Sequence, residues 1–251
     1  MGIRASNESC PVSNSQSPNS ATNVATLTLK PLKSYWPFLG RGGCLVRMLE
    51  HTSTPYEYVS EAGRFGEVMG RWGASTGCFA PPVVVDGGYT ISQSTATCMY
   101  VGDKCGLNGQ PSFDSFKAQQ HLLDIVDVFE NGLGKKNEDG ADLKEFLKEG
   151  GRWQQLMGNL EAGVGPGPYY FGATPSAVDF FLAHHIDIRV VTLFGPLGEV
   201  MGREWKGLFG DFPKCLGIYE SLSGTEQWKN FDKIKQMGRV KDEILQAYKA
   251  A

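Results

Sequence analysis

The pattern of apolar and polar positions changes character along the chain. TLTLKPLKSY at residues 26–35 alternates as a strand does, and GCLVRMLEHT at 43–52 carries apolar residues at helical spacing. PYEYVS at 55–60 is strand-like again. The order strand, helix, strand predicts a βαβ unit with a parallel strand pair.

A second pair of strands is predicted downstream. VVV at 83–85 is typical of a third strand, and GGYTI at 87–91 predicts a tight turn and a fourth strand, antiparallel to the third. SQSTATCMYVGDKCG at 92–106 predicts a helix that ends at Gly106. The first half of the chain is therefore an α/β unit.

Strand signals stop after LNGQPSFDS at 107–115, which contains glycine and proline. Helical spacing then recurs at 114–134, 141–163, 175–195, 212–224 and 226–251, and a glycine pair at 150–151 favours a break in the second of these segments. We predict an α/β domain at 26–107, a linker at 108–113 and an all-helical domain at 114–251.

The first 25 residues differ from the rest, because they are rich in Ser and Asn and almost free of large apolar side chains. Such a segment cannot offset its ordering entropy, so we predict disorder at 1–25. It lacks the apolar centre of a secretory signal. Gly2 and Ser6 match the N-myristoylation pattern, and Cys10 lies close enough for a second lipid. An inert or organelle-targeting tail and weak membrane attachment through Gly2 both stay open.

Composition narrows the class of protein. The chain has 251 residues, of which 41% are hydrophobic and 20% charged, with a net charge of −3 and no basic cluster, which argues against nucleic-acid binding. No apolar run reaches the roughly 18 residues of a membrane span. The six cysteines form no C-x-x-C pair in a chain this large. We therefore expect reduced thiols and a cytoplasmic protein.

The stretch APPVVVDGGYTISQSTA at 80–96 combines two binding devices. A cis proline before a strand leaves the flanking backbone groups pointing outward, where an extended ligand can pair with them. Ser94 falls at the N-terminus of the next predicted helix, where a hydroxyl and free N–H groups can hold a carboxylate. Together they suit a short peptide with a free α-carboxylate.

The segment PVVVDGGYTISQSTA at 82–96 resembles the glutathione-binding core of the cytosolic glutathione transferases. The resemblance implies an N-terminal thioredoxin-like domain followed by an all-helical domain, in agreement with the two predicted halves. It also implies that Pro82 is the cis proline and that Val83 pairs with the cysteinyl backbone of glutathione. Gln93 and Ser94 would bind the γ-glutamyl group.

A second segment, YWPFLGRGGCLVRMLEHTSTPYE at 35–57, is similar to the first strand, loop and helix of the tyrosine-type enzymes, especially those of the mu class. The shared positions are Tyr35, Trp36, Gly40, Leu49, Glu50, Thr52, Tyr56 and Glu57. The arginine of the family's first helix falls at Val46, one residue before Arg47. FGATPSAVDFF at 171–181 resembles a conserved box of the helical domain, in which Ser176 and Asp179 would form a helix-capping box.

These resemblances imply roles for individual residues. Tyr35, with a phenol pKa of about 10, would donate a hydrogen bond to the glutathione thiolate, which is the nucleophile. Trp36 either flanks glutathione or packs in the core. Trp72 would donate its indole N–H to the glycine carboxylate, with Arg71 as the alternative, and Arg41 either contacts glutathione or is a solvated charge.

Three acidic or nucleophilic side chains could have either a functional or a purely structural role. Asp124 and Asp127 either reach the γ-glutamyl amine across a dimer, as in some relatives, or lie on a solvated helix face. Cys44 could be the nucleophile of a cysteine-type transferase. Such an enzyme would place its cysteine at the end of the first strand, where this sequence has Tyr35 instead.

His184, His185 and Asp187 could suggest a metal site. Adjacent helical residues diverge by about 100°, so the two histidines cannot easily share one ion, and we expect no metal.

The resemblance implies a detoxifying glutathione transferase with glutathione as co-substrate, a small apolar electrophile as partner and a homodimeric assembly. A sigma-type, prostaglandin-synthase-like isomerase would use the same site. The third hypothesis is that the protein keeps this fold but serves as a non-catalytic binding or structural protein. The unusual GRGGC loop and the short segment around Trp72 favour it, whereas intact Tyr35, Pro82, Gln93 and Ser94 argue against it.

Overall fold

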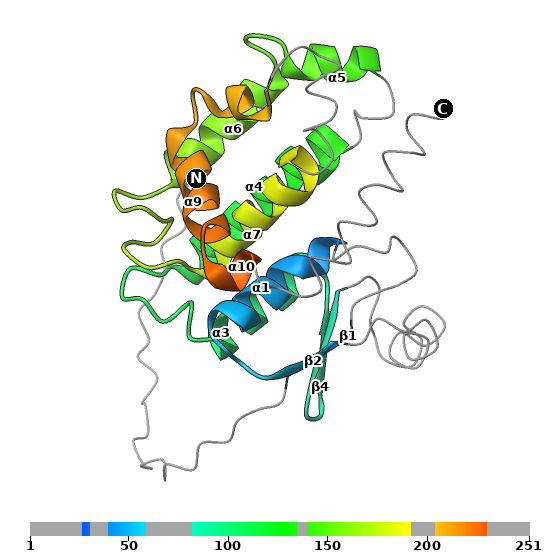
Figure 1. Ribbon diagram of the computed structural model, residues 1–251, viewed down its shortest axis with the longest axis vertical. Helices are drawn as coiled ribbons and strands as arrows, with labels where there is room; N and C mark the ends of the chain where they lie inside the picture. Colours follow the sequence, from blue (N-terminus) through cyan, green and yellow to red (C-terminus); the bar gives the residue numbers. More distant parts are fainter. Residues whose placement is uncertain (1–26, 31–39, 59–81, 135–139, 192–203, 230–251) are drawn as a thin grey trace, which may run out of the picture.

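The structure is a computed structural model that describes residues 27–30, 40–58, 82–134, 140–191 and 204–229. Its first half is a four-stranded sheet with two helices, and its second half is helical (Figure 1). No helix in the described part of the chain is long and apolar enough to cross a membrane. The predicted disordered tail at 1–25 lies outside the described residues.

The sheet has the order β2-β1-β3-β4. Its strands are β1 (Leu27–Lys30), β2 (Tyr56–Tyr58), β3 (Val83–Asp86) and β4 (Tyr89–Ser92). β1 is parallel to β2 and antiparallel to β3, and β3 and β4 form a hairpin. Gly87 turns that hairpin with φ of +60°, a left-handed conformation that glycine adopts without steric cost. The predicted βαβ unit and antiparallel fourth strand are therefore confirmed.

Two helices of the first half cover one face of the sheet. A short 3₁₀ turn, η1 (Gly40–Gly42), leads into α1 (Gly43–His51), and α3 (Ser94–Lys104) follows β4. α3 ends where expected, because Gly106, just past the helix, takes a left-handed φ of +70°. The predicted strand at 26–35 is confirmed over β1, and its remainder lies outside the described residues.

The second half contains two layers of helices above α1 and α3 (Figure 1). Its elements are α4 (Ser115–Val126), η2 (Asp127–Gly134), α5 (Gly140–Leu147), α6 (Arg152–Gly163), α7 (Ala177–Ile186), η3 (Asp187–Val191), η4 (Trp205–Phe209), α9 (Pro213–Ser223) and α10 (Glu226–Lys229). The predicted break at the glycine pair separates α5 from α6, with Gly150 at a φ of +69°.

Two predicted helices continue differently from a regular α-helix. α4 passes into the π-helical η2, and α7 passes into the π-helical η3. The apolar spacing of the sequence does not distinguish the two hydrogen-bonding patterns, so the prediction missed both. The segment predicted as helix at 226–251 begins as α10, and the rest of it lies outside the described residues.

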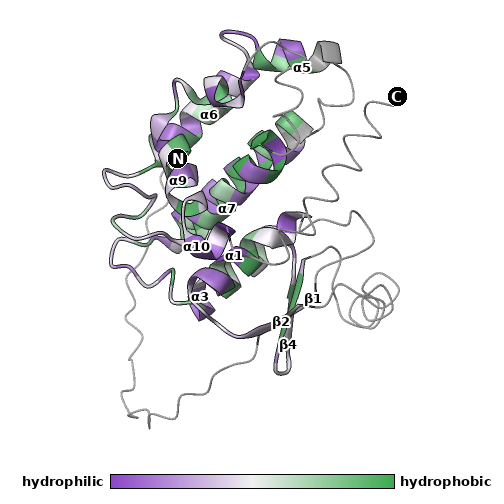
Figure 2. Cartoon of the chain, viewed as in Figure 1, coloured by the Kyte–Doolittle hydropathy of each residue, from purple (hydrophilic) through white to green (hydrophobic). Residues whose placement is uncertain are grey.

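α7 is the central helix of the molecule. All ten of its residues are buried, it packs against α1, α3, α4 and α9, and much of it is coloured as hydrophobic in Figure 2. Its N-terminus carries the predicted capping box, in which the Ser176 N–H donates to Asp179 Oδ2 at 2.7 Å. The Tyr170 N–H donates to Asp179 Oδ1 at 2.9 Å. Asp179 thus ties the preceding loop to the helix start and confirms the box.

Candidate functional site

The sheet register brings two predicted binding segments together beside the end of β1. Val83 lies opposite Ser92 in the β3–β4 hairpin and opposite Lys30 in the β1–β3 pair. The buried Pro82 directly precedes Val83, and the Gln93–Ser94 pair directly follows Ser92. The start of β3, the end of β4 and the end of β1 therefore meet at one end of the sheet.

The N-terminus of α3 has an unusual backbone. Gln93, its N-cap residue, has φ of +76° and ψ of 134°, which non-glycine residues rarely adopt and which costs on the order of 1–3 kcal/mol. The Thr97 backbone N–H and hydroxyl both donate to the Gln93 carbonyl, at 2.9 and 2.7 Å. Gln93 is exposed, and Ser94 beside it is buried. No local sequence signal predicted this strain or the role of Thr97.

Several predicted site residues lie outside the described residues: Tyr35, Trp36, Arg71 and Trp72. Arg41 is described, lies in η1 and is half-buried. Cys44 is fully buried in α1, and its thiol donates to the Arg41 carbonyl at 3.4 Å. A reactive thiol needs access to its substrate, so the burial of Cys44 argues against it as nucleophile.

η1 is held from the helical half. His184 Nε2, on α7, lies 2.6 Å from the Gly40 carbonyl oxygen. His185 Nδ1 instead lies 2.8 Å from the Phe181 carbonyl of its own helix, and the two imidazole planes stand at 85°. The two histidines thus have different partners, and the described residues contain no cluster of ligands that could hold a metal ion.

One ion pair lies at this interface between the halves, and a second lies within the helical half. The buried Arg47 of α1 pairs with Asp187, which also accepts a hydrogen bond from the Tyr219 hydroxyl at 3.2 Å. The Arg47 guanidinium lies 3.3 Å above the Trp228 ring centre. Sequence reasoning missed this contact, because it noted Arg47 only as one residue out of register with the family arginine.

The second pair joins Glu130 of η2 to Arg189 of η3, with two guanidinium nitrogens on one carboxylate. Burial opposes ionisation of Glu130, but the hydrogen bond and charge of Arg189 outweigh it, and the pKa of Glu130 lies below its ordinary value. His185 Nε2 is 3.6 Å from the same carboxylate. The two π-helical segments are therefore linked electrostatically.

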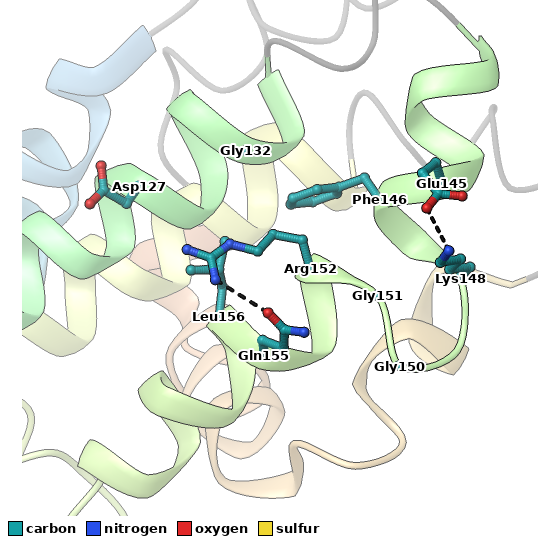
Figure 3. Close-up of a pocket in the computed structure, with 10 residues that line it drawn as sticks. All are labelled: Asp127, Gly132, Glu145, Phe146, Lys148, Gly150, Gly151, Arg152, Gln155 and Leu156. Atoms are coloured by element: carbon teal, nitrogen blue, oxygen red, sulfur yellow. Dashed lines mark hydrogen bonds and ion pairs between the residues drawn. The ribbon is translucent and has the colours of Figure 1, made fainter.

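A cavity of about 610 Å³ lies elsewhere, between η2, α5 and α6 (Figure 3). Its charged lining is largely paired within itself, since Lys148 bonds Glu145 at 2.5 Å and Arg152 donates to Gln155 at 3.2 Å. Asp127 also lines it, whereas Asp124 on α4 accepts a hydrogen bond from Gln120 at 3.4 Å. Apart from Asp127, one of the two aspartates that could reach a γ-glutamyl amine across a dimer, no residue predicted to bind glutathione lines this cavity.

Comparison with protein-family models and with curated protein sequences finds no match. Solved structures do match over most of their length. The pi-class glutathione S-transferase of Onchocerca volvulus has a TM-score of 0.63 at 13% identity, covering 86% of this chain and 96% of that chain.

Two further structures match at similar levels. A glutathione transferase family member from Pseudomonas fluorescens, solved with two glutathione bound, has a TM-score of 0.57 at 19% identity, covering 84% and 93% of the two chains. Prostaglandin synthase D of Nilaparvata lugens has a TM-score of 0.56 at 17% identity, covering 82% and 95%. The protein therefore has the glutathione transferase fold, a thioredoxin-like N-terminal domain followed by a helical domain.

Proposed function

We propose that the protein is a glutathione transferase of the tyrosine type. The observation that carries the proposal is the convergence of the Pro82–Val83 and Gln93–Ser94 segments at one end of the sheet. β1 ends at the same place, and Tyr35 follows its last residue, Lys30, by five positions in the sequence. A thiol tripeptide can be bound by pairing with a strand edge and by holding its carboxylate at a helix N-terminus. A phenol can then activate its thiol.

The γ-glutamyl end of glutathione would lie at the N-terminus of α3. The Ser94 hydroxyl and the free N–H groups of the first turn would hold the α-carboxylate, helped by the positive end of the helix dipole. The strained backbone of Gln93 supports this placement, because strained residues persist only where the surrounding structure holds them and they cluster at ligand-binding sites. The Gln93 side chain is exposed and would reach the same group.

Tyr35 would stabilise the thiolate that attacks the electrophile. Lowering a thiol pKa by about two units corresponds to roughly 2.7 kcal/mol, which a directed phenol hydrogen bond in a dry site can largely supply. Trp36 and Arg41 would flank glutathione from the loop, and Trp72, or Arg71 in its place, would hold the glycine carboxylate. No metal enters this chemistry, and the electrophile would be small and apolar.

A glutathione-dependent isomerase is the second candidate. The same fold occurs in prostaglandin synthase D of Nilaparvata lugens and in rat hPGDS complexed with a quinoline. An isomerase would use the same thiolate and return the tripeptide unchanged. We propose a cytoplasmic, detoxifying role for the transferase, and leave N-myristoylation of Gly2 as a separate proposal.

We also propose a homodimer. Phe116 and Leu123 are 82% and 57% exposed on α4, and their seven-residue spacing places them on one face of that helix. Large exposed apolar side chains that share a face are typical of protein interfaces. A second copy of the chain would cover them.

Binding and turnover test the proposal together. Glutathione binding is measured by calorimetry on wild type, Ser94→Val and Thr95→Val, the last altering a neighbouring α3 residue outside the predicted site. We expect Ser94→Val alone to weaken binding by about tenfold, because a carboxylate loses a charge-assisted hydrogen bond. Conjugation of an aryl halide marks a transferase, conversion of a prostaglandin endoperoxide alone marks an isomerase, and binding without either marks a non-catalytic protein. A wild type that does not bind glutathione contradicts the proposal.

A further inference from the structure

Near the start of α3, two donors of one buried threonine converge on a single carbonyl. The backbone N–H and the hydroxyl of Thr97 lie 2.9 and 2.7 Å from the carbonyl oxygen of Gln93. The hydroxyl also lies 3.2 Å from the Ser94 carbonyl oxygen. Thr97 is fully buried, so water does not compete for its hydroxyl. The hydroxyl therefore bonds only to the backbone that begins the helix.

The acceptor distinguishes this contact from that of an ordinary helical threonine. A threonine hydroxyl often bonds the carbonyl four positions earlier inside a regular helix. Here the acceptor is the N-cap residue Gln93, whose φ of +76° and ψ of 134° are rare for a residue with a side chain. Such a conformation persists only where the surrounding structure holds it. A second donor on the Gln93 carbonyl contributes to that restraint.

The direction of the Gln93 carbonyl also sets the direction of the next N–H group. The carbonyl of Gln93 and the N–H of Ser94 belong to one planar peptide unit, and a trans bond points them in opposite directions. Because the carbonyl points along α3 toward Thr97, the Ser94 N–H points away from the body of the helix. The Gln93 side chain makes no capping hydrogen bond to this described helix, so it leaves the N–H groups of the first turn to another acceptor.

We propose that Thr97 is a positioning residue for the γ-glutamyl carboxylate of glutathione. By holding the Gln93 carbonyl, the Thr97 hydroxyl keeps the Ser94 N–H directed at that carboxylate. This inference rests on the proposed function. Thr97 is buried, so its effect on the ligand passes through the backbone of Gln93 and Ser94.

Two substitutions at Thr97 separate the hydroxyl from the packing. Thr97→Val keeps the shape and removes the hydroxyl, whereas Thr97→Ser keeps the hydroxyl and removes a methyl group. Thr52→Val is the matched control, because the Thr52 hydroxyl also bonds a carbonyl four positions earlier, that of Met48, at 2.9 Å. Thr52 interacts with Cys105, which lies at the opposite end of α3 from Gln93.

Each protein is titrated by calorimetry with glutathione and with 4-aminobutanoyl-cysteinylglycine, which lacks only the γ-glutamyl α-carboxylate. We expect Thr97→Val to weaken glutathione binding by about fivefold, as for one lost hydrogen bond, and binding of the analogue by less than about twofold. Thr97→Ser should bind glutathione as wild type does. Thr52→Val should lose about as much thermal stability as Thr97→Val, with no change in either affinity.

Turnover provides a second readout. The carboxylate lies at the other end of the tripeptide from the thiol, so the change should act on binding more than on chemistry. Thr97→Val should raise KM for glutathione by about fivefold and lower kcat for an aryl halide by less than about twofold. If Thr97→Val does not fold, Thr97→Ala, which removes the same hydroxyl from a smaller side chain, takes its place.

Two failures are distinguishable. If wild type binds glutathione and Thr97→Val binds it equally well, or weakens both ligands alike, the positioning role is wrong and the proposed function stands. If wild type does not bind glutathione, the proposed function fails and the positioning role fails with it.

Discussion

Val83 and Ser92 lie opposite each other in the β3–β4 hairpin, so the residues on either side of them, Pro82 and Gln93, are brought to the same end of the sheet. A tight turn at Gly87 sets this register, and a shift by one residue would move every side chain of β4 to the other face. The two binding segments of the proposed glutathione site are therefore adjacent because of a two-residue turn.

Gln93→Gly should separate strain from binding. Glycine tolerates the positive φ, so the free energy of unfolding should rise by about 1 kcal/mol, while glutathione affinity should fall by about tenfold as the amide contact is lost. Ser53, an exposed residue with φ of +52°, provides the control. Ser53→Gly should give a similar gain in stability, measured by thermal unfolding, without any change in affinity. Unchanged glutathione binding in Gln93→Gly would remove Gln93 from the site.

Asp187→Asn should destabilise the contact between the halves. The substitution leaves the buried Arg47 charge without its partner, which typically costs about 3–5 kcal/mol. Replacing both Asp187 and Arg47 by neutral residues should recover part of this loss in a double-mutant cycle. The exposed pair Lys206–Glu220, 2.7 Å apart, is the control, and Glu220→Gln should cost less than about 1 kcal/mol. Similar losses from denaturant unfolding of the two variants would contradict this account.

Stability should fall as pH decreases from about 6.5 to about 4. Burial, opposed by the charge of Glu130, lowers the pKa of His185 to about 4. Over that interval the unfolded imidazole binds a proton and the folded one does not, so acid favours unfolding. His185→Gln keeps a donor toward Phe181 but does not titrate. Its unfolding free energy should therefore decrease by about 2–3 kcal/mol less than that of wild type across this range, and parallel curves would show that His185 contributes nothing.

Phe116→Glu should dissociate the proposed homodimer, because it places a charge in an apolar contact. Leu123→Glu should act in the same direction, and Lys117→Gln, at an exposed position about 100° around α4 from Phe116, should leave the assembly intact. Sedimentation velocity on the three variants and wild type measures the change. A wild type that is monomeric at micromolar concentration removes α4 as a dimer surface.

Local sequence signals predicted the features that local chemistry determines. The apolar run at 83–85 and a glycine turn predicted the hairpin, and the glycine pair at 150–151 predicted the break between α5 and α6. Ser176 with Asp179 predicted the capping box. Each depends on residues within a few positions of one another. The fold class followed from the order of these elements together with the family resemblance.

Features that depend on distant partners could not be predicted. The hydrogen bond between His184 and Gly40 and the ion pair between Arg47 and Asp187 each join residues about 140 positions apart. The sequence near each of these residues contains no signal of its distant partner. Gln93 is not a residue type that signals a positive φ, and the hydrogen bonds that hold its carbonyl come from Thr97, four positions downstream. The π-helical form of η2 and η3 was not predicted, because the apolar residues of these segments are spaced as they would be in an α-helix.

The central claim is most directly tested by following thiolate absorbance against pH while reduced glutathione is bound to wild type and to Tyr35→Phe, with an aryl halide conjugation assay alongside. We predict that wild type lowers the thiol pKa by about two units and conjugates, and that the Phe variant binds glutathione but loses both effects. If both proteins bind glutathione and behave alike, Tyr35 does not activate the thiol and the tyrosine mechanism is wrong.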